Sequence, residues 1–247
     1  MKTRLDVLLV ARGLVATRER ARALILAGDV RVNGQPATKA GTAVADDARV
    51  DLRAPDHPWV GRGGLKLAHA LEVFGLDVRG FAALDLGAST GGFTDVLLAN
   101  GAARVVALDV GEGQLDWRLR TDPRVVCLER VNARYLTPEM LPVNARRFDL
   151  VTADVSFISL RHILPAIPPL LARGGRVVVL VKPQFEAGRH EVGAGGVVRD
   201  VTVQQRAIET VADAALQVGL TRVAVEPSPV TGAEGNREFL MLLAPAP

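Results

Sequence analysis

Short apolar runs alternate with segments of helical periodicity over the last three quarters of the chain. Several of these runs are rich in valine and lack polar alternation, as parallel strands do when both faces of their sheet are buried. The pattern therefore predicts a doubly wound α/β sheet. The predicted strands are Ala82–Leu86, Val105–Val110, Val125–Leu128, Leu150–Asp154, Arg176–Val181, Val223–Val225 and Phe239–Ala244.

The first 52 residues follow a different pattern. Two short amphipathic helices are predicted there, one ending at Gly13 and one running from an N-cap at Thr17 to Gly28. A strand and a tight Asn-Gly turn follow at Val30–Gly34. Residues 1–52 therefore predict a small α+β domain in which two helices are followed by two strands.

Two prolines separate these patterns. Pro55 and Pro58 lie within the six residues Arg53–Pro58, and such spacing predicts a linker. We therefore expect a domain at residues 1–52, a linker at 53–60 and a second domain at 61–247.

A glycine-rich loop connects the first predicted strand of the second domain to a helix. Its spacing is G-x-x-x-G-G, from Gly87 to Gly92, with Asp85 two residues before it. Glycines allow a ligand to approach the backbone closely, and a helix N-terminus presents free N–H groups. Asp109 ends the next strand, where an acid accepts hydrogen bonds from a ribose diol in nucleotide-binding sheets.

This spacing resembles the S-adenosylmethionine loop of Rossmann-like methyltransferases. A dinucleotide site would need G-x-G-x-x-G, and a bare strand–helix turn in some other α/β protein is the plainer alternative. The last predicted strand also suits the extra antiparallel edge strand of methyltransferase sheets. The residues expected to contact the cofactor are Asp85, Gly87, Ala88, Ser89, Thr90, Gly91, Gly92, Phe93, Asp109, Asn132 and Asp154. No metal site is expected.

Two kinds of methyl acceptor are disfavoured. The end of the fourth predicted strand reads Asp154-Val155-Ser156-Phe157, so the two prolines are missing from the motif of a polar residue, Pro-Pro and an aromatic that grips a base for methylation of its exocyclic amine. Methylation of a pyrimidine carbon would need a nucleophilic cysteine. The one cysteine, Cys127, lies in an apolar strand and is expected to be buried and inert.

Lysine is scarce, with 26 Arg but only four Lys in the chain. Lys66 and Lys182 fall at the ends of predicted elements, as do Asp154 and Glu238. Any one of these side chains alone is most simply a solvated surface charge. Four of them on elements that converge at one edge of a sheet favour a site, and a desolvated ammonium can lose its proton beside other cations.

Four stretches resemble one known family. They are Arg62–Leu67, Gly87–Thr94, Asp154–Leu160 and Val181–Glu186, and they are similar to the TlyA family of ribosomal RNA 2′-O-methyltransferases, often labelled hemolysin A. The resemblance covers nearly the whole chain. It implies a Rossmann-like S-adenosylmethionine-dependent methyltransferase sheet, similar to FtsJ-type enzymes, behind a small N-terminal domain that resembles the RNA-binding domain of ribosomal protein S4.

The resemblance also implies a reaction and its residues. The family's Lys-Asp-Lys-Glu tetrad maps onto Lys66, Asp154, Lys182 and Glu238, and the substrate would be a cytidine ribose in ribosomal RNA. Members that modify both ribosomal subunits tend to carry a helical extension after the last strand. This chain stops at Pro247, so we expect the class that acts on large-subunit RNA.

In that reaction Lys182 would deprotonate the attacking 2′-oxygen or stabilise it electrostatically. Lys66 would favour the neutral form of Lys182 through like-charge repulsion, and Glu238 would orient the lysines. Asp154 would hold the amino group of the cofactor and orient Lys182, although its charge favours the ammonium form. Alignment would supply most of the gain in rate.

The net charge of +3 is unevenly distributed. Residues 1–53 carry +4 and the remainder −1, which suits a first domain that meets phosphate, although an ordinary solvated basic face is the alternative. Aromatic residues are only 4%, so recognition should depend on RNA shape and phosphates. The arginines expected to bind RNA are Arg4, Arg18, Arg20, Arg22 and Arg62. The segment Gly188–Val198 is either a mobile flap over the RNA or a plain flexible loop.

Composition excludes several other classes. A hydrophobic content of 49% excludes a disordered chain, and the longest clean aliphatic run, Val177–Val181, is far too short to cross a bilayer. A single cysteine cannot form an internal disulfide, which fits a cytoplasmic protein. Two alternatives to an enzyme stay open: a non-catalytic RNA-binding or ribosome-assembly factor and, less favoured, a membrane-lytic hemolysin.

Overall fold

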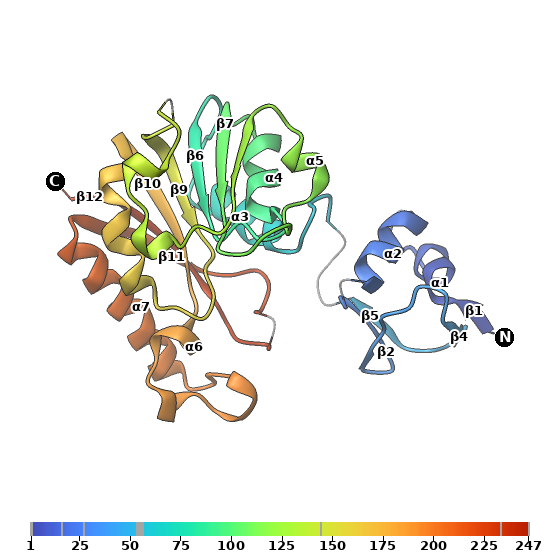
Figure 1. Cartoon of the computed structure of the whole chain (residues 1–247). Helices are drawn as coiled ribbons and strands as arrows, with labels where there is room; N and C mark the ends of the chain where they lie inside the picture. The colour runs from blue at the N-terminus through green and yellow to red at the C-terminus, as the bar shows by residue number, and fades with distance from the viewer. Residues whose placement is uncertain are drawn as a thin grey trace. The chain divides into compact units, whose positions relative to one another are not determined.

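The computed structural model describes residues 2–15, 17–26, 28–52, 57–143, 145–232 and 234–246. The chain forms two compact units, Met1–Pro58 and Trp59–Pro247, whose elements are labelled in Figure 1. Residues 53–56 of the expected linker lie outside the described residues, so the linker stays a prediction.

The first unit packs two helices against short antiparallel strands. β1 pairs with β4, and a three-stranded sheet has the order β3-β2-β5. The sequence predicted two helices followed by two strands; it missed β1 and two of the four strands after α2, because runs of two or three residues are too short to show a period of two. The elements are β1 (Lys2–Arg4), α1 (Leu5–Ala11), α2 (Arg18–Leu26), β2 (Val30–Val32), β3 (Gln35–Pro36), β4 (Ala43–Ala45) and β5 (Val50–Leu52).

Local signals set the boundaries in this unit. The Oγ1 atom of Thr17 accepts a hydrogen bond of 3.1 Å from the backbone N–H of Arg20, which confirms the predicted N-cap of α2. Asn33 and Gly34 connect β2 to β3 with φ of 50° and 80°, the left-handed pair that a two-residue hairpin turn requires. The apolar faces of both helices are buried in a core that belongs to this unit alone.

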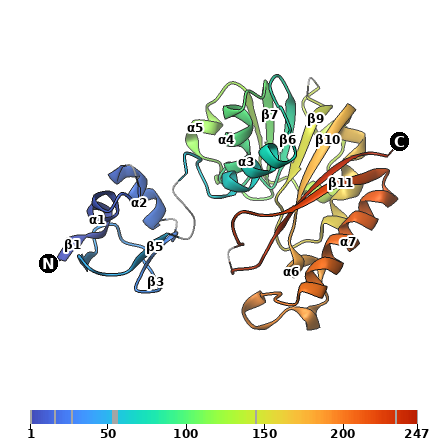
Figure 2. The ribbon, with the colours of Figure 1, turned by 180° about the vertical axis from the view of Figure 1, so that it is seen from behind.

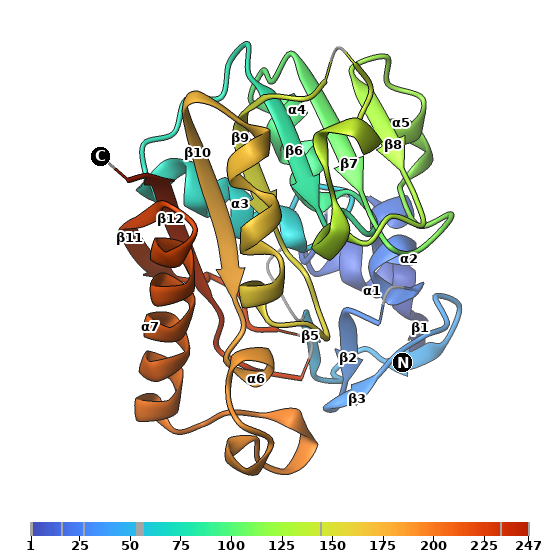
Figure 3. The same cartoon turned by 60° about the vertical axis from the view of Figure 1, so that its left-hand side comes forward.

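The second unit is built on a seven-stranded sheet in the order β11-β12-β10-β9-β6-β7-β8, seen in Figure 3. Strands β6 to β10 run parallel, and β12 runs antiparallel to both of its neighbours. All seven predicted strands are confirmed, although their ends differ. They are β6 (Ala82–Leu86), β7 (Arg104–Leu108), β8 (Val125–Leu128), β9 (Phe148–Ala153), β10 (Leu171–Val181), β11 (Leu220–Pro227) and β12 (Phe239–Pro245).

The last strand lies inside the sheet, so its predicted position at the edge is wrong. The side chains from Leu240 to Leu243 are buried, and β12 is flanked by β10 and β11. Such a continuous apolar run is stable only where neighbouring elements cover both faces of the strand. β11 is largely exposed and forms the edge instead. The predicted antiparallel direction of β12 is confirmed.

Helices cover both faces of this sheet, as the doubly wound prediction requires. α3 (Gly63–Val73) and α4 (Gly92–Ala99) pack on one face, as Figure 2 shows, and α7 (Val201–Gln217) packs on the other. Among the described residues, no helix combines the length and the apolar character needed to cross a membrane. The shorter elements are α5 (Trp117–Arg120), α6 (Pro183–Glu186) and the 3₁₀ turns η1 (Ala133–Tyr135), η2 (Pro138–Met140), η3 (Leu160–His162), η4 (Leu164–Ala166), η5 (Pro168–Leu170), η6 (Arg189–Glu191) and η7 (Ala194–Gly196).

Candidate active site

Four charged side chains meet at the edge of the sheet where the parallel strands end. Asp154 directly follows β9 and Lys182 directly follows β10. In the antiparallel ladder Phe239 pairs with Val181, so Glu238, just before β12, lies at the same edge. Lys66 belongs to α3, which begins at Gly63, so this lysine lies in the first helical turn and not at the helix start.

These four side chains form one connected ion-pair network. The Nζ atom of Lys182 lies 2.6 Å from Oδ1 of Asp154, and Nζ of Lys66 lies 3.7 Å from Oδ2 of the same carboxylate. Lys66 also donates a hydrogen bond of 2.7 Å to Oε2 of Glu238. The structure therefore brings the four predicted residues together, with Asp154 between the two lysines.

The network is nearly closed to solvent. Lys66 and Lys182 are each 7% exposed and Glu238 is 3% exposed. Burial alone would raise the pKa of Asp154, but the charges of Lys66 and Lys182 outweigh it and hold this pKa below its ordinary value. Two ammonium groups and two carboxylates balance each other, which allows four charges to be buried together.

Ser156 is a further contact that the sequence did not single out. Its Oγ atom accepts a hydrogen bond of 2.8 Å from Nζ of Lys182. Lys182 is therefore held by two oxygen atoms, both from the segment that follows β9. A serine two residues after a candidate acid is a common pattern, and nothing in the sequence marked it as a partner of a residue 26 positions away.

Gly87 brings the glycine-rich loop against this network. It adopts φ of 81°, and a Cβ atom there would lie 2.5 Å from the carbonyl oxygen of Asp154. Only glycine fits this backbone conformation and this approach. The loop after β6 and the end of β9 are thus in direct contact, which places the glycine-rich loop next to the charged network.

A pocket opens beside the glycine-rich loop, at the ends of β7 and β8. Apolar side chains form part of its wall, and the carboxylates of Asp109 and Glu129 lie at the polar side. The lining residues are Ala88, Ser89, Ala107, Asp109, Gly111, Gln114, Leu115, Cys127, Leu128 and Glu129. Such a mixture of apolar wall and few polar groups is typical of small-molecule sites.

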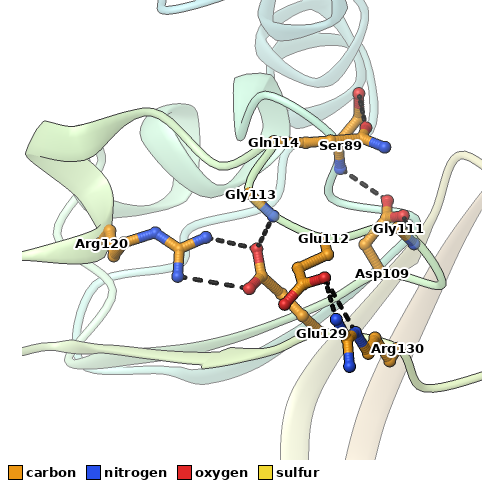
Figure 4. Close-up of polar contacts among 9 residues, drawn as sticks. All are labelled: Ser89, Asp109, Gly111, Glu112, Gly113, Gln114, Arg120, Glu129 and Arg130. Carbon is orange, nitrogen blue, oxygen red and sulfur yellow. Dashed lines mark hydrogen bonds and ion pairs between the residues drawn. The ribbon is translucent and has the colours of Figure 1, made fainter.

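Backbone N–H groups hold both carboxylates in place, as Figure 4 shows. Asp109 accepts hydrogen bonds from Ser89 N at 2.8 Å and from Gly111 N at 2.7 Å. Glu129 accepts one from Gly113 N at 2.7 Å and forms an ion pair with Arg120. Glu129 directly follows β8, as Asp109 directly follows β7. The criterion of an acid at a strand end, which singled out Asp109, would therefore have singled out Glu129 as well.

The pocket suits the nucleoside part of a cofactor. Carboxylates at strand ends can accept hydrogen bonds from ribose hydroxyls, and the apolar wall can cover a base. Of the residues predicted to contact a cofactor, Ala88, Ser89 and Asp109 line this pocket.

The other predicted cofactor residues lie outside the lining. Asp85 is fully buried beneath the loop, where it accepts hydrogen bonds from Thr94 and Thr152, and burial raises its pKa to about 6. Asn132 caps η1 through a hydrogen bond from Arg134 N. The remaining members of the predicted set are Gly87, Thr90, Gly91, Gly92, Phe93 and Asp154.

Cys127 lines the pocket and is only partly buried, so the predicted full burial is wrong. Burial raises the pKa of its thiol above the ordinary value. The thiol is therefore protonated at neutral pH, which agrees with the expectation that Cys127 is not a nucleophile.

Two of the arginines predicted to bind RNA share one buried carboxylate within the first unit. Arg4 donates two hydrogen bonds of 3.0 Å to Asp6, and Arg18 donates one of 3.0 Å to the same group. Asp6 is fully buried, and its hydrogen bonds with Arg4 outweigh burial and hold its pKa well below the ordinary value. Arg18 thus joins α2 to α1, whereas Arg4 makes a local contact from the end of β1, and both arginine side chains are about half exposed.

The remaining predicted arginines have separate surroundings. Arg20 contacts the ring of His57 at 3.0 Å and 3.1 Å, and Arg22 is exposed on α2. Arg62 is the N-cap residue of α3 in the second unit. Within the first unit, the structure thus brings Arg4 and Arg18 together on one carboxylate.

The segment Gly188–Val198 contains two 3₁₀ turns and is tied down at its end. Asn236 donates a hydrogen bond of 2.8 Å to Gly196 O and accepts one of 2.9 Å from Val198 N. Gln204 donates another to Val198 O. Whether this segment moves over a substrate stays a prediction.

Comparisons with known proteins agree with this architecture. A family model described as FtsJ-like methyltransferase matches residues 59–244, and an S4 domain model matches residues 3–50. A 16S/23S rRNA (cytidine-2′-O)-methyltransferase TlyA from Mycobacterium tuberculosis is 51% identical over 98% of this chain and 90% of its own length. The chain belongs to the TlyA family. Its second unit is accordingly an FtsJ-like methyltransferase domain, and its first unit is an S4 domain.

Other TlyA-like proteins carry a different description. Hemolysin A from Brachyspira hyodysenteriae is 40% identical over 96% of this chain and 98% of its own length. A solved structure of a candidate hemolysin from Streptococcus thermophilus has a TM-score of 0.78 and 44% identity, covering 99% of this chain and 89% of that one. The family and the Rossmann-like fold expected from sequence are confirmed.

Proposed function

We propose that this chain transfers a methyl group from S-adenosylmethionine to the 2′-hydroxyl of a cytidine in ribosomal RNA. The observation that supports this most strongly is the connected network of Lys66, Asp154, Lys182 and Glu238 next to the glycine-rich loop. The relative from Mycobacterium tuberculosis is named for this reaction on both 16S and 23S rRNA.

The cofactor would be held by the pocket and the loop. Asp109 and Glu129 would accept hydrogen bonds from hydroxyl or amine groups of the nucleoside, and Leu115 and Leu128 would cover apolar surface. Asp154 would receive the amino group of the methionine part. When bound, S-adenosylmethionine supplies a methyl group that is already activated, so no covalent enzyme intermediate is needed.

Lys182 would hold the attacking oxygen. Its Nζ atom is held by contacts with Asp154 at 2.6 Å and Ser156 at 2.8 Å. An ammonium can donate a hydrogen bond to the ribose oxygen and stabilise the negative charge that develops on it. In the overall reaction the oxygen–methyl bond forms as the sulfur–methyl bond breaks, and the hydroxyl proton passes to solvent.

The S4 domain would supply affinity for RNA. Arg4 and Arg18 present two half-exposed guanidinium groups next to each other, and guanidinium forks match phosphate geometry. The mapping experiment below distinguishes modification of large-subunit RNA alone from modification of both subunits.

Ribosomal RNA from cells with and without this gene tests the proposal when it is mapped for 2′-O-methyl groups. We expect one or more cytidines to lose the modification in the deletion strain and regain it with the wild-type gene. Purified protein with S-adenosylmethionine and unmodified ribosomal subunits should methylate the same positions. A protein that binds RNA but neither binds S-adenosylmethionine in a calorimetric titration nor methylates RNA would be a non-catalytic RNA-binding factor instead.

The Lys182→Arg variant tests whether Lys182 acts as a base in addition to supplying a positive charge. A guanidinium keeps the charge but cannot act as a base, and its larger fork cannot occupy the narrow space between Asp154 and Ser156. We expect kcat to fall by at least about tenfold, with the affinity for S-adenosylmethionine changed much less. Methyl transfer at the wild-type rate would rule out any role for Lys182 as a base.

A further inference from the structure

A second buried carboxylate lies close to the network but outside it. Glu186 ends α6, four residues after Lys182, and is 9% exposed. Its Oε2 accepts a hydrogen bond of 2.5 Å from Ser159 Oγ, and its Oε1 accepts one of 2.8 Å from Leu160 N. Burial raises its pKa above the ordinary value despite these bonds.

Two hydrogen-bond donors face the carboxylate of Glu186. Among the residues that the structure describes, no Lys, Arg or His nitrogen lies within ion-pair distance of this carboxylate. Ser159 Oγ accepts hydrogen bonds from Arg161 N at 3.2 Å and Arg161 Nε at 3.1 Å. Because these bonds use both lone pairs of the hydroxyl, Ser159 can only donate to Glu186.

Glu186 joins the two segments that carry the catalytic groups. One segment, residues 154–160, follows β9, and the other, 182–186, follows β10. At their start the segments are joined by Lys182 with Asp154 and Ser156. At their end they are joined by Glu186 with Ser159 and Leu160. The turn formed by residues 154–160 is therefore held at both of its ends.

That turn has a conformation that needs external support. Phe157 has φ of 65° although it is not glycine, and it is 92% exposed, so burial of its own side chain does not compensate for the strain. Its ring lies 5.4 Å from that of Phe185, which belongs to α6. Residues 182–186 therefore contact the segment at Asp154, Ser156, Phe157, Ser159 and Leu160, in addition to the contacts that Lys66 and Gly87 make with Asp154.

We propose that Glu186 is a positioning residue for methyl transfer, because it holds residues 154–160 so that Asp154 and Ser156 are fixed against Lys182. A buried carboxylate without a direct ion pair is costly even though the charges of Arg161 and His162 favour it, and an apolar contact would join two loops at lower cost. The cost is offset where the two hydrogen bonds fix a geometry that catalysis needs within a fraction of an ångström. This inference depends on the proposed methyltransferase function.

The test uses the full-length protein with S-adenosylmethionine and ribosomal subunits. Glu186→Ala removes both acceptors, Glu186→Gln keeps one, and Ser159→Ala removes one donor. Asp149→Asn is the matched control. Asp149 also accepts a hydrogen bond from a backbone N–H, that of Ala82, but it lies where the parallel strands begin, away from the catalytic side chains at their carboxyl ends. The measurements are kcat, KM for each substrate, calorimetric affinity for S-adenosylmethionine and the unfolding midpoint.

We expect Glu186→Ala to lower kcat at least tenfold while the affinity for S-adenosylmethionine stays within threefold of wild type, and Glu186→Gln to lower kcat by less. Ser159→Ala and Glu186→Gln should be non-additive in kcat when combined, because both act on one contact. Asp149→Asn should keep the wild-type kcat even where it lowers the unfolding midpoint.

Wild-type kcat in a folded Glu186→Ala variant would overturn the inference, as would a loss of activity matched by Asp149→Asn at equal loss of stability. Additive effects of the Ser159 and Glu186 changes would also contradict it. If wild-type protein itself fails to methylate ribosomal RNA, the proposed function fails instead, and that result is seen before any variant is compared.

Discussion

Asp85 is the buried group whose charge should cost this fold the most. Its carboxylate lies beneath the glycine-rich loop and accepts hydrogen bonds from two threonine hydroxyls. It has no ion pair within the part of the chain that the structure describes, and burial raises its pKa from 3.8 to about 6. A shift of about two units corresponds to about 3 kcal/mol. We predict that Asp85→Asn makes the second unit more stable at pH 7 by about 1–3 kcal/mol, because an amide can still bond both Thr94 and Thr152.

The sign of the pH dependence follows from linkage. Between about pH 4 and 6 the folded state holds a proton on Asp85 that the unfolded state has released, so wild-type stability from this group falls as pH rises. The difference in unfolding free energy between Asp85→Asn and wild type should therefore be near zero at pH 4 and reach its full value above pH 6. Both tryptophans, Trp59 and Trp117, belong to the second unit, so fluorescence during urea unfolding reports on that unit alone.

Asp149→Asn serves as the control, since it makes the same chemical change on a partly exposed carboxylate. It should not stabilise the protein. The reasoning would be refuted by an Asp85→Asn variant that is less stable than wild type at pH 7, or by a stability gap that does not vary with pH. If Asp85 contacts the cofactor directly, as its place in the motif first suggested, the variant would instead lose affinity for S-adenosylmethionine.

Two other substitutions test the loop and the S4 domain. Gly87→Ala should lower the unfolding midpoint and abolish methyl transfer, because the new Cβ would lie 2.5 Å from a backbone oxygen at a φ that costs about 1–2 kcal/mol; activity and thermal shift measure this. Asp6→Asn should destabilise the first unit by about 1–3 kcal/mol at pH 7. This difference in unfolding free energy should begin to shrink as pH falls to the ordinary pKa of an aspartate and should disappear only below it, because folding lowers the pKa of Asp6. Hydrogen exchange of α1 and α2 would follow it, and protection equal to wild type would contradict it.

The sequence predicted the parts of the site that follow from strand ends. Asp154, Lys182 and Asp109 each follow or end an apolar run, and parallel strands bring such ends to one edge whatever the details of packing. Glu129 satisfies the same rule. Helix starts are harder to place, because α3 begins with two glycines at Gly63 and extends three residues before Lys66.

Contacts between distant segments could not be predicted in the same way. Glu186 and Ser159 are 27 positions apart, and only the register of β9 beside β10 brings their loops together. The same holds in the first unit. A charge balance over residues 1–53 counts the charges of Arg4, Asp6 and Arg18, but it does not show that the Asp6 carboxylate holds both guanidinium groups. The net charge of +4 shows that residues 1–53 are basic. It does not show which of their arginines are held by a carboxylate.

The scarcity of lysine has a physical explanation in the completed site. Lys66 and Lys182 are 7% exposed; the Lys182 ammonium lies between oxygen atoms at 2.6 and 2.8 Å, and the Lys66 ammonium lies 2.7 Å from Glu238 and 3.7 Å from Asp154. A guanidinium carries five N–H donors on a planar fork, and in this enclosed space several of them would be buried without acceptors, at about 1–3 kcal/mol each. A compact ammonium has three donors, and for Lys182 two are used by Asp154 and Ser156. One donor is then left for the oxygen that attacks the methyl group. A chain that otherwise uses arginine for its cations therefore retains lysine at the two positions where an arginine would leave donors unsatisfied.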